Sequence, residues 1–399
     1  MIGLLLAIFT LSGVEGLAQG GAVEQGKIDA AVKKGVEWLK KAPSPGFTYG
    51  KIDDSDPLIL LTLIHAGVPE SDARVQELLK GMLEKPLMRT YLVTLQAMVL
   101  EEIDRAKYQN RIAQCAQFLV DNQCSNGQWS YGEPSEHVKE VPPAKDVASG
   151  GGKKAGVIDF GGGGGEKVKP KITRKITVKK MKDGPGIGDN SNTMYAALGL
   201  RACHDSGILL PKDVVEAARR WFVECQFPAE SNNVASGDGA VARGWCYARK
   251  DVCAKKHGAY GGMTAGATGA LVIYNYILGT DWKRDPAVRS GNAWMAQKFA
   301  PDQNPGENEL GNEKTELYYT LYAAERLGML SGQTLFGKHD WYVEGASFLL
   351  GAQKESGGWD DGVGRSTSTW DTCFAILFLK KATRALVASE DVSKRRDSK

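Results

Sequence analysis

Cysteine is scarce in this chain, with seven among 399 residues. An odd number excludes complete pairing within one chain, and so low a density excludes a small fold built on disulfides. Cys246 and Cys253 are close enough in sequence to form a local disulfide if the protein is exported. Most of the other cysteines lie in apolar helical runs, where we expect buried thiols.

A large excess of one charge is missing as well. The 50 Lys and Arg against 47 Asp and Glu leave a net charge of +3, so no specific nucleic-acid partner is predicted. Several catalytic signatures are absent, including the serine-hydrolase motif and the Cys-Gly-Glu-Gln thioester stretch. The glycines at 161–165 are not followed by the Lys-Ser/Thr of a phosphate loop. We therefore predict no bound cofactor.

The N-terminus carries an apolar run over residues 2–14, followed by Gly16 and Ala18, small residues at the positions that a signal peptidase reads. About 13 apolar residues are too few to span a bilayer comfortably but suit a signal peptide. We predict that residues 1–18 are a secretory signal and that the protein is exported, to the periplasm or outside the cell.

An internal repeat is the strongest pattern in the sequence. Residues 118–129 and 348–359 share the spacing aromatic-Leu-x3-Gln-x3-Gly-x-Trp, and weaker copies occur at 38–50, 221–245 and 294–299. Each copy ends one predicted helix and precedes another, which gives about six helical hairpins. The first helices are expected near 27–41, 72–84, 107–122, 212–226, 286–299 and 340–352, and the second near 55–66, 90–101, 191–205, 263–279, 313–328 and 368–381.

The second helices are apolar nearly all round, whereas the first carry charge on one face. A helix that is apolar on every side is buried on every side. The pattern therefore predicts an all-α fold, an α/α toroid with an inner ring of helices inside an outer ring, formed by one domain over residues 27–381. A charged C-terminal tail follows at 385–399.

A Gly- and Lys-rich insertion interrupts the repeats at 133–189. Residues 139–182 contain twelve Lys and Arg against four Asp and Glu, a local net charge of +8. Such composition favours a flexible segment, with a short strand expected only at 172–178. A flexible basic arm next to a cell envelope is predicted to contact an anionic surface.

The repeat spacing resembles that of the squalene-cyclase and protein-prenyltransferase superfamily, of which this chain looks like a degenerate member. The resemblance implies a structural role for Gln123, Trp129, Gln353 and Trp359 between neighbouring hairpins. It also points to Asp53 and Asp54 as candidate catalytic acids. Lys51 stands where that family has a further Asp, and the alternative is that these aspartates cap a helix.

The loops at one end of the ring supply aromatic and polar candidates for ligand binding. A weak metal candidate, Cys246 with Cys253 and His257, lies among them and competes with the disulfide. The candidate ligand-binding residues are Trp129, Tyr131, Trp245, Tyr247, His257, Tyr260, Trp359, Asp360, Asp361 and Trp370.

Three functions stay open at this point. The first is binding or scaffolding through the toroid, with an isoprenoid, lipid or polymer as the ligand. The second is a terpenoid cyclase or transferase, which requires a carboxylic acid kept neutral in an apolar cavity. The third is a carbohydrate-active α/α-barrel enzyme, a glycosidase or polysaccharide lyase with paired carboxylates. The contents of the central lumen decide among them.

Overall fold

The computed structural model describes residues 23–46, 54–143, 145–146, 169–229, 239–253, 258–306, 314–363 and 367–386. The predicted signal peptide and residues 387–399 of the predicted tail lie outside this part of the chain. Within it, no helix combines the length and the apolar character needed to cross a membrane.

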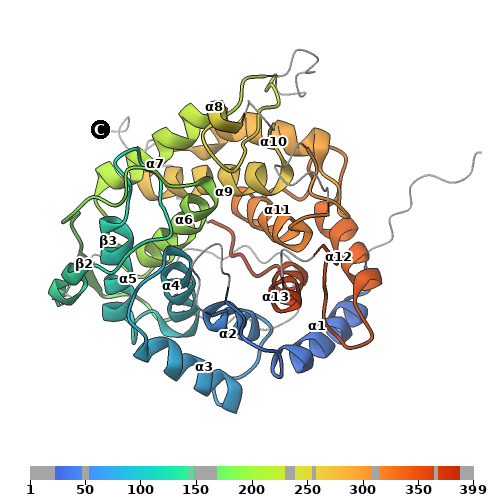
Figure 1. Ribbon diagram of the computed structural model, residues 1–399, viewed down its shortest axis with the longest axis horizontal. Coiled ribbons are helices and arrows are strands. Elements are labelled where there is room, and N and C mark those ends of the chain that lie inside the picture. Colours follow the sequence, from blue (N-terminus) through green and yellow to red (C-terminus); the bar gives the residue numbers. More distant parts are fainter. Residues whose placement is uncertain are drawn as a thin grey trace, which may run out of the picture.

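Helices alternate along the chain between an outer and an inner ring (Figure 1). Each inner helix contacts the next inner helix, and α13 contacts α2, so the inner ring closes. This confirms the predicted all-α toroid. The outer helices are α1 (Gln25–Leu39), α3 (Ala73–Glu84), α5 (Gln109–Asp121), α7 (Lys212–Cys225), α10 (Pro286–Lys298) and α12 (Trp341–Ala352). The inner helices are α2 (Asp56–His65), α4 (Thr90–Asp104), α6 (Asn190–Asp205), α9 (Gly261–Leu278), α11 (Leu317–Ser331) and α13 (Ser368–Leu379).

The two rings follow from the polarity of their helices. In α9 every residue from Gly261 to Asn275 is buried, whereas α7 buries only one face, which includes Val214, Ala218 and Phe222. A helix with a single apolar stripe is stable only with its other face in water. The all-apolar helices therefore occupy the centre and the amphipathic helices surround them.

The repeated glutamine joins neighbouring hairpins through backbone carbonyls. Gln123 Nε2 donates to the Gly127 carbonyl of its own turn (3.3 Å) and to the Val214 carbonyl at the start of α7 (2.8 Å). Gly127 has a φ of 91°, and a Cβ there would lie 2.5 Å from the Ala217 carbonyl oxygen on α7. Glycine is therefore required at this turn both for its backbone conformation and for its close approach to α7.

The same arrangement closes the ring. Gln353 Nε2 donates to the Gly357 carbonyl (2.8 Å) and, across the junction between the last and first hairpins, to the Ala31 carbonyl on α1 (2.9 Å). A third copy joins α7 to α10, where Gln226 Nε2 donates to the carbonyl of Ala287 (3.1 Å). The predicted structural role of the motif is confirmed.

More of the insertion is ordered than the short strand predicted within a flexible segment. Strand β2 (Arg174–Thr177) pairs in parallel with β3 (Ile208–Leu209) and antiparallel with β1 (Lys145–Asp146), as the expected strand at 172–178 indicated. Ile176 and Val178 are buried, and Gln117 on α5 donates to the Lys179 carbonyl (2.6 Å). Alternating apolar side chains therefore anchor residues 169–189, and residues 147–168 lie outside the described part.

The shorter elements lie between the main helices. They are the 3-10 helices η1 (Glu136–Glu140) and η2 (Trp282–Arg284) and the single turn α8 (Lys250–Cys253).

The end of the ring where the inner helices finish is crossed by residues 382–386. Thr383 donates through its N–H and Oγ1 to the Glu325 carboxylate on α11 (2.9 and 2.8 Å). Arg384 donates to Glu102 on α4 (2.8 Å) and accepts, through its carbonyl, from Arg201 on α6 (2.8 Å). The chain after α13 thus ties three inner helices together at this end.

Replacing Gln353 with Ala is expected to destabilise the fold by about 1–3 kcal/mol, because two part-buried hydrogen bonds between hairpins are lost. Urea unfolding measures the loss. The Gln123→Ala variant is the matched control inside the ring and is expected to cost a similar amount. Hydrogen exchange separates the two variants, because Gln353→Ala should accelerate exchange in α1 and Gln123→Ala in α7. Equal exchange in α1 for both variants would contradict a specific role of Gln353 in ring closure.

Candidate functional site

Three of the predicted ligand-binding residues, Trp129, Trp245 and Trp359, are fully buried at 0% exposure. Their indole N–H groups donate to backbone carbonyls of their own hairpins, at 2.7 to 2.8 Å. Their backbone N–H groups donate to a threonine Oγ1 on the following inner helix. The prediction of ligand contact is wrong for these tryptophans, because the motif uses them to join the two helices of a hairpin.

The residue two positions after each tryptophan is half-buried instead: Tyr131, Tyr247 and Asp361. The Tyr131 carbonyl accepts from Thr90 N at the start of α4 (2.8 Å), and the Tyr247 carbonyl from Asn190 N at the start of α6 (2.9 Å). These residues therefore surround the end of the ring where the inner helices begin. We call this end the mouth.

Asp189 lies at the mouth between the two tyrosines and the start of α6. Its Oδ1 accepts from Asn192 N (2.7 Å) and its Oδ2 from Asn192 Nδ2 (2.8 Å), so it caps α6. The Tyr247 side chain also hydrogen-bonds to it, and the Tyr247 and Tyr131 hydroxyl oxygens are 3.2 Å apart. Burial raises the pKa of Asp189 to about 6, against the stabilising hydrogen bonds to its ionised form.

Aromatic rings continue from the mouth into the lumen. Tyr91 on α4 hydrogen-bonds to Ser191 on α6, and its ring centroid lies 4.2 Å from that of Tyr195. Tyr319 on α11 stacks against Tyr195 with the ring centroids 6.3 Å apart. Tyr91 and Tyr319 are half-buried, whereas Tyr195 is 2% exposed. The mouth is thus an aromatic surface with hydroxyl groups, above a more closely packed interior.

The interior contains a buried cation. Arg326 on α11 is 3% exposed, and its guanidinium carbon lies 4.3 Å from the ring centroid of Tyr322 and 5.3 Å from that of Tyr195. Phe374 on α13 stacks against Tyr322 on the same level. No carboxylate forms a salt bridge with Arg326 among the described residues. Side chains of α6, α11 and α13 therefore occupy this level of the lumen.

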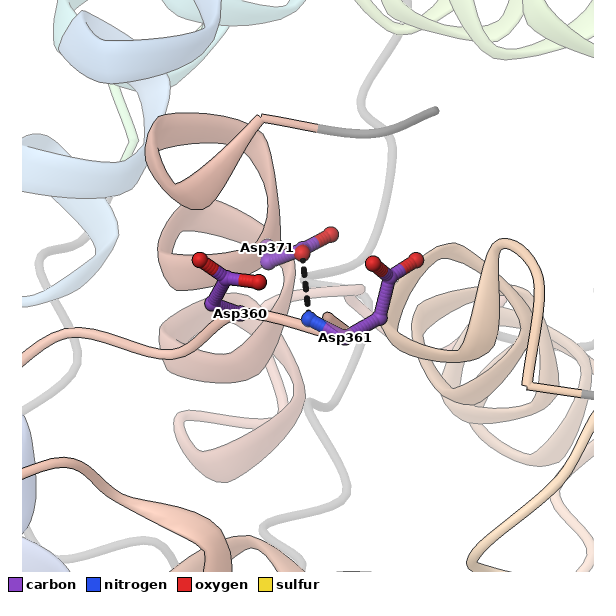
Figure 2. Close-up of side chains that lie close together, drawn as sticks. All are labelled: Asp360, Asp361 and Asp371. Atoms are coloured by element: carbon purple, nitrogen blue, oxygen red, sulfur yellow. Dashed lines mark hydrogen bonds between the residues drawn. The ribbon is translucent and has the colours of Figure 1, made fainter. Parts of the chain in front are cut away.

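Asp360 and Asp361 form an acidic trio with Asp371 on α13 (Figure 2), in which carboxylate oxygens lie within 4.8 Å of one another. Each carboxylate accepts a backbone N–H of the adjoining turn. Asp371 accepts from Asp361 N (2.9 Å), Asp361 from Val363 N and Asp360 from Gly362 N. These bonds give the trio a role in shaping the turn, and acidic grouping alone does not define a metal site.

Of the two predicted catalytic aspartates, Asp54 belongs to the described part of the chain. Asp53 lies outside the described residues. Asp54 Oδ1 accepts from Asp56 N at the start of α2 (3.0 Å), and its Oδ2 is 2.7 Å from Lys85 Nζ. Both carboxylate oxygens are thus engaged, one by the N-terminus of α2 and the other by an ammonium group. The geometry favours the capping alternative for Asp54.

The remaining candidates are divided between the core and the mouth. Tyr260 is 3% exposed, so the prediction of ligand contact is wrong for it, and its N–H donates to the Trp245 carbonyl (3.1 Å). Trp370 is half-buried in the first turn of α13, and its indole N–H donates to Ser55 Oγ. Trp370 is therefore a neighbour of the mouth rather than part of the tyrosine cluster.

Cys246 and Cys253 form a disulfide, with their Cα atoms 6.5 Å apart. A disulfide sulfur is not a thiolate, so this pair cannot be the predicted metal ligands. His257, the third candidate, lies outside the described residues. The disulfide suits an oxidising compartment.

Several residues of the candidate site were not identified from the sequence: Asp189, Arg326, Tyr91, Tyr195, Tyr319 and Tyr322. Asp189 precedes a predicted helix, and an N-cap signal was available there. A single sequence does not show that Arg326 faces the lumen, because a charged residue of an inner helix can equally face one end of the ring.

Comparisons with known proteins add little to this geometry. No family model and no curated protein matches the chain. Solved structures of the type II terpene cyclase MstE from Scytonema, one apo and one of a variant with geranylgeranyl dihydroxybenzoate, align with it at 12% identity. They cover 90% of this chain and 99% and 97% of the other chains, with a TM-score of 0.31. A TM-score this low supports no inference about function.

The disulfide predicts a specific thiol count. Alkylation after denaturation without a reductant should modify five cysteines, the buried thiols Cys115, Cys124, Cys203, Cys225 and Cys373. Alkylation after reduction should modify all seven. Intact-mass spectrometry gives both counts. If seven cysteines are modified before reduction, Cys246 and Cys253 are free thiols, and the pair is again a candidate for metal binding.

Asp189→Asn is expected to change how stability depends on pH. The folded pKa of about 6 is above the unfolded value of 3.8, so the fold disfavours ionisation, and wild-type stability falls as pH rises through this range. Asn keeps the cap and cannot ionise, so the variant should gain about 1–3 kcal/mol relative to wild type between pH 4 and pH 7. Urea unfolding at both pH values measures the difference. A constant difference would mean that Asp189 titrates normally.

Proposed function

We propose that the protein binds its ligand without transforming it, and that the toroid is a rigid scaffold for a binding surface at the mouth. The ligand class that this surface fits best is a hydroxyl-rich chain, a polysaccharide. Export follows from the predicted signal peptide and places the protein where such polymers occur. The observation that carries the proposal is the tyrosine cluster at the mouth, and the guanidinium of Arg326 inside the lumen argues against the cyclase alternative.

A buried guanidinium disfavours polyene cyclisation. Protonation of an alkene produces a carbocation, which a cyclase stabilises in an apolar lumen. Here the faces of Tyr195 and Tyr322 already lie over the Arg326 cation. Two unit charges at about 5 Å repel each other by several kcal/mol when screening is weak. A carbocation at this level would therefore be destabilised rather than stabilised.

The mouth has the chemistry for binding sugars. Aromatic rings with polar tips pack against C–H faces while their hydroxyls form hydrogen bonds. Tyr131 and Tyr247 meet at their hydroxyls, and Asp189 lies beside Tyr247. Tyr91 contributes a further half-buried ring from α4. Side chains from separate hairpins thus combine into one surface.

The acidic trio of Asp360, Asp361 and Asp371 does not have the geometry of a glycosidase. That reaction needs two carboxyl groups that face each other across the scissile bond, about 5–9.5 Å apart. The oxygens of Asp360, Asp361 and Asp371 instead lie within 4.8 Å and bind the backbone of one turn. The arrangement supports binding rather than hydrolysis.

An anionic-surface contact through residues 139–182 has less support than the sequence indicated. Lys169 lies in a network with Glu101 and Glu102, so its charge is neutralised within the fold. Lys180 pairs with Asp183 (2.7 Å). Lys171, Lys175 and Lys179 stay exposed on the ordered part. The lysines at 153, 154 and 167 lie outside the described part, so the proposed contact rests on both groups.

Calorimetric titration of the mature chain with cellohexaose and with hexagalacturonate tests the proposal. We expect binding of at least one oligosaccharide, weakened about tenfold by Tyr247→Ala, because a stacking surface and a hydroxyl are lost. Tyr276→Ala is the matched control. Tyr276 is also half-buried, but its hydroxyl contacts Asp205 at the opposite end of the ring (3.0 Å).

A second arm tests for catalysis. Incubation with squalene or geranylgeraniol, followed by mass spectrometry and chromatography, is expected to return the substrate unchanged. A cyclised product that disappears in Asp189→Asn would overturn the non-catalytic proposal and make Asp189 the proton donor. Equal weakening of saccharide binding by Tyr247→Ala and Tyr276→Ala would contradict binding at the mouth.

A further inference from the structure

A separate cavity of about 180 Å³ lies at the end of the ring opposite the mouth. It is formed where α11 ends and α12 begins, with Met329, Trp341, Tyr342 and Val343 among its walls. Its two charged residues are Asp340, which precedes α12, and Lys381, which follows α13. Neither belongs to the mouth, so the cavity is independent of the function proposed above.

Lys381 occupies a backbone position that normally favours glycine. Helix α13 ends in a Schellman motif, in which Lys381 N donates to the Phe378 carbonyl (3.0 Å) and Ala382 N to the Leu377 carbonyl (3.1 Å). Lys381 has a φ of 46°, in the left-handed region. Glycine would adopt this conformation without strain, so the helix end does not explain a lysine here.

The Lys381 side chain is directed toward the cavity and has no acidic partner there. Its Nζ lies 3.8 Å from the ring centroid of Tyr342, whose hydroxyl is fixed by donation to the Leu379 carbonyl (2.9 Å). Among the described residues, no carboxylate lies within salt-bridge distance of Nζ. Burial lowers the pKa of Lys381, while the more distant Asp340 and Glu325 act in the opposite direction.

Asp340 has one carboxylate oxygen available to the cavity. Its Oδ1 caps α12 by accepting from Val343 N (3.0 Å). Its Oδ2 has no hydrogen-bond partner within the described part of the chain. A cation and an anion that are not paired with each other therefore border the same cavity.

The walls between them are apolar and rigid. The Trp341 indole N–H donates to the Gln333 carbonyl (2.8 Å), and its ring stacks on Phe336. A cavity of about 150 Å³ with apolar walls is large enough for benzene. The present cavity thus has room for an apolar side chain of that size.

We infer that this cavity binds a small zwitterion, an amino acid with an apolar side chain. The ligand's carboxylate would bind Lys381, its ammonium group would bind Asp340 Oδ2, and its side chain would pack against Trp341 and Tyr342. Lysine at the end of α13 is then explained by ligand binding, at a conformational cost that glycine would avoid.

Calorimetric titration of the mature chain tests the inference with three probes: L-phenylalanine, phenethylamine, which lacks the carboxylate, and 3-phenylpropanoate, which lacks the ammonium group. Wild type is expected to bind L-phenylalanine at least about tenfold more tightly than either analogue. Lys381→Met should remove the preference over phenethylamine. Asp340→Asn, which keeps the helix cap, should remove the preference over 3-phenylpropanoate.

Two further variants separate binding from folding. Lys380→Met changes a neighbouring lysine outside the cavity and should leave all three affinities unchanged. Lys381→Gly should raise the melting temperature, because it relieves the left-handed conformation, and should still lose L-phenylalanine binding. The inference is overturned if wild type shows no binding to millimolar L-phenylalanine, or if Lys380→Met weakens binding as much as Lys381→Met.

Discussion

The toroid depends on one repeated contact, the hydrogen bonds from a glutamine amide to the backbone carbonyls of two hairpins. A helical hairpin with apolar inner helices leaves an exposed face at each end of an open array, and only closure removes both faces. Gln353 makes the closing contact with Ala31, with the same geometry that Gln123 uses inside the array. Because one amide group donates to carbonyls of two hairpins at once, these bonds fix the position of each hairpin relative to the next.

That constraint determines which side chains reach the mouth. Hydrogen bonds from the glutamine and the tryptophan fix both ends of the turn between them. The indole therefore points into the hairpin, and the residue two positions after the tryptophan lies at the mouth. Tyr131 and Tyr247, from different hairpins, consequently meet at their hydroxyls. The sequence analysis predicted ligand contact for the two tyrosines and for the tryptophans alike, because spacing alone does not show which residue of a turn faces inward.

Helix positions were predictable to within a few residues because polarity differs so strongly between the rings. Which part of the insertion is ordered was less predictable, because the order depends on few residues. Composition averaged over residues 139–182 is dominated by Gly and Lys, whereas order at 169–189 depends on a few apolar side chains such as Ile176 and Val178 and on donors from α5. The position of Arg326 in the lumen was not predictable, since most residues of α11 are buried and the sequence does not show which face of the helix meets the lumen.

The centre of the lumen is separate from the contacts that hold the ring closed. The hydrogen bonds that join the hairpins lie at the turns and do not involve the centre of the lumen, so side chains there can change without opening the ring. In this chain the centre holds a cation surrounded by tyrosine and phenylalanine rings. Those rings already stabilise the guanidinium, and the surfaces left for ligands are the two ends of the ring. Function in this toroid is therefore expected at its ends, the mouth with its tyrosines and the cavity beside Lys381, rather than in its core.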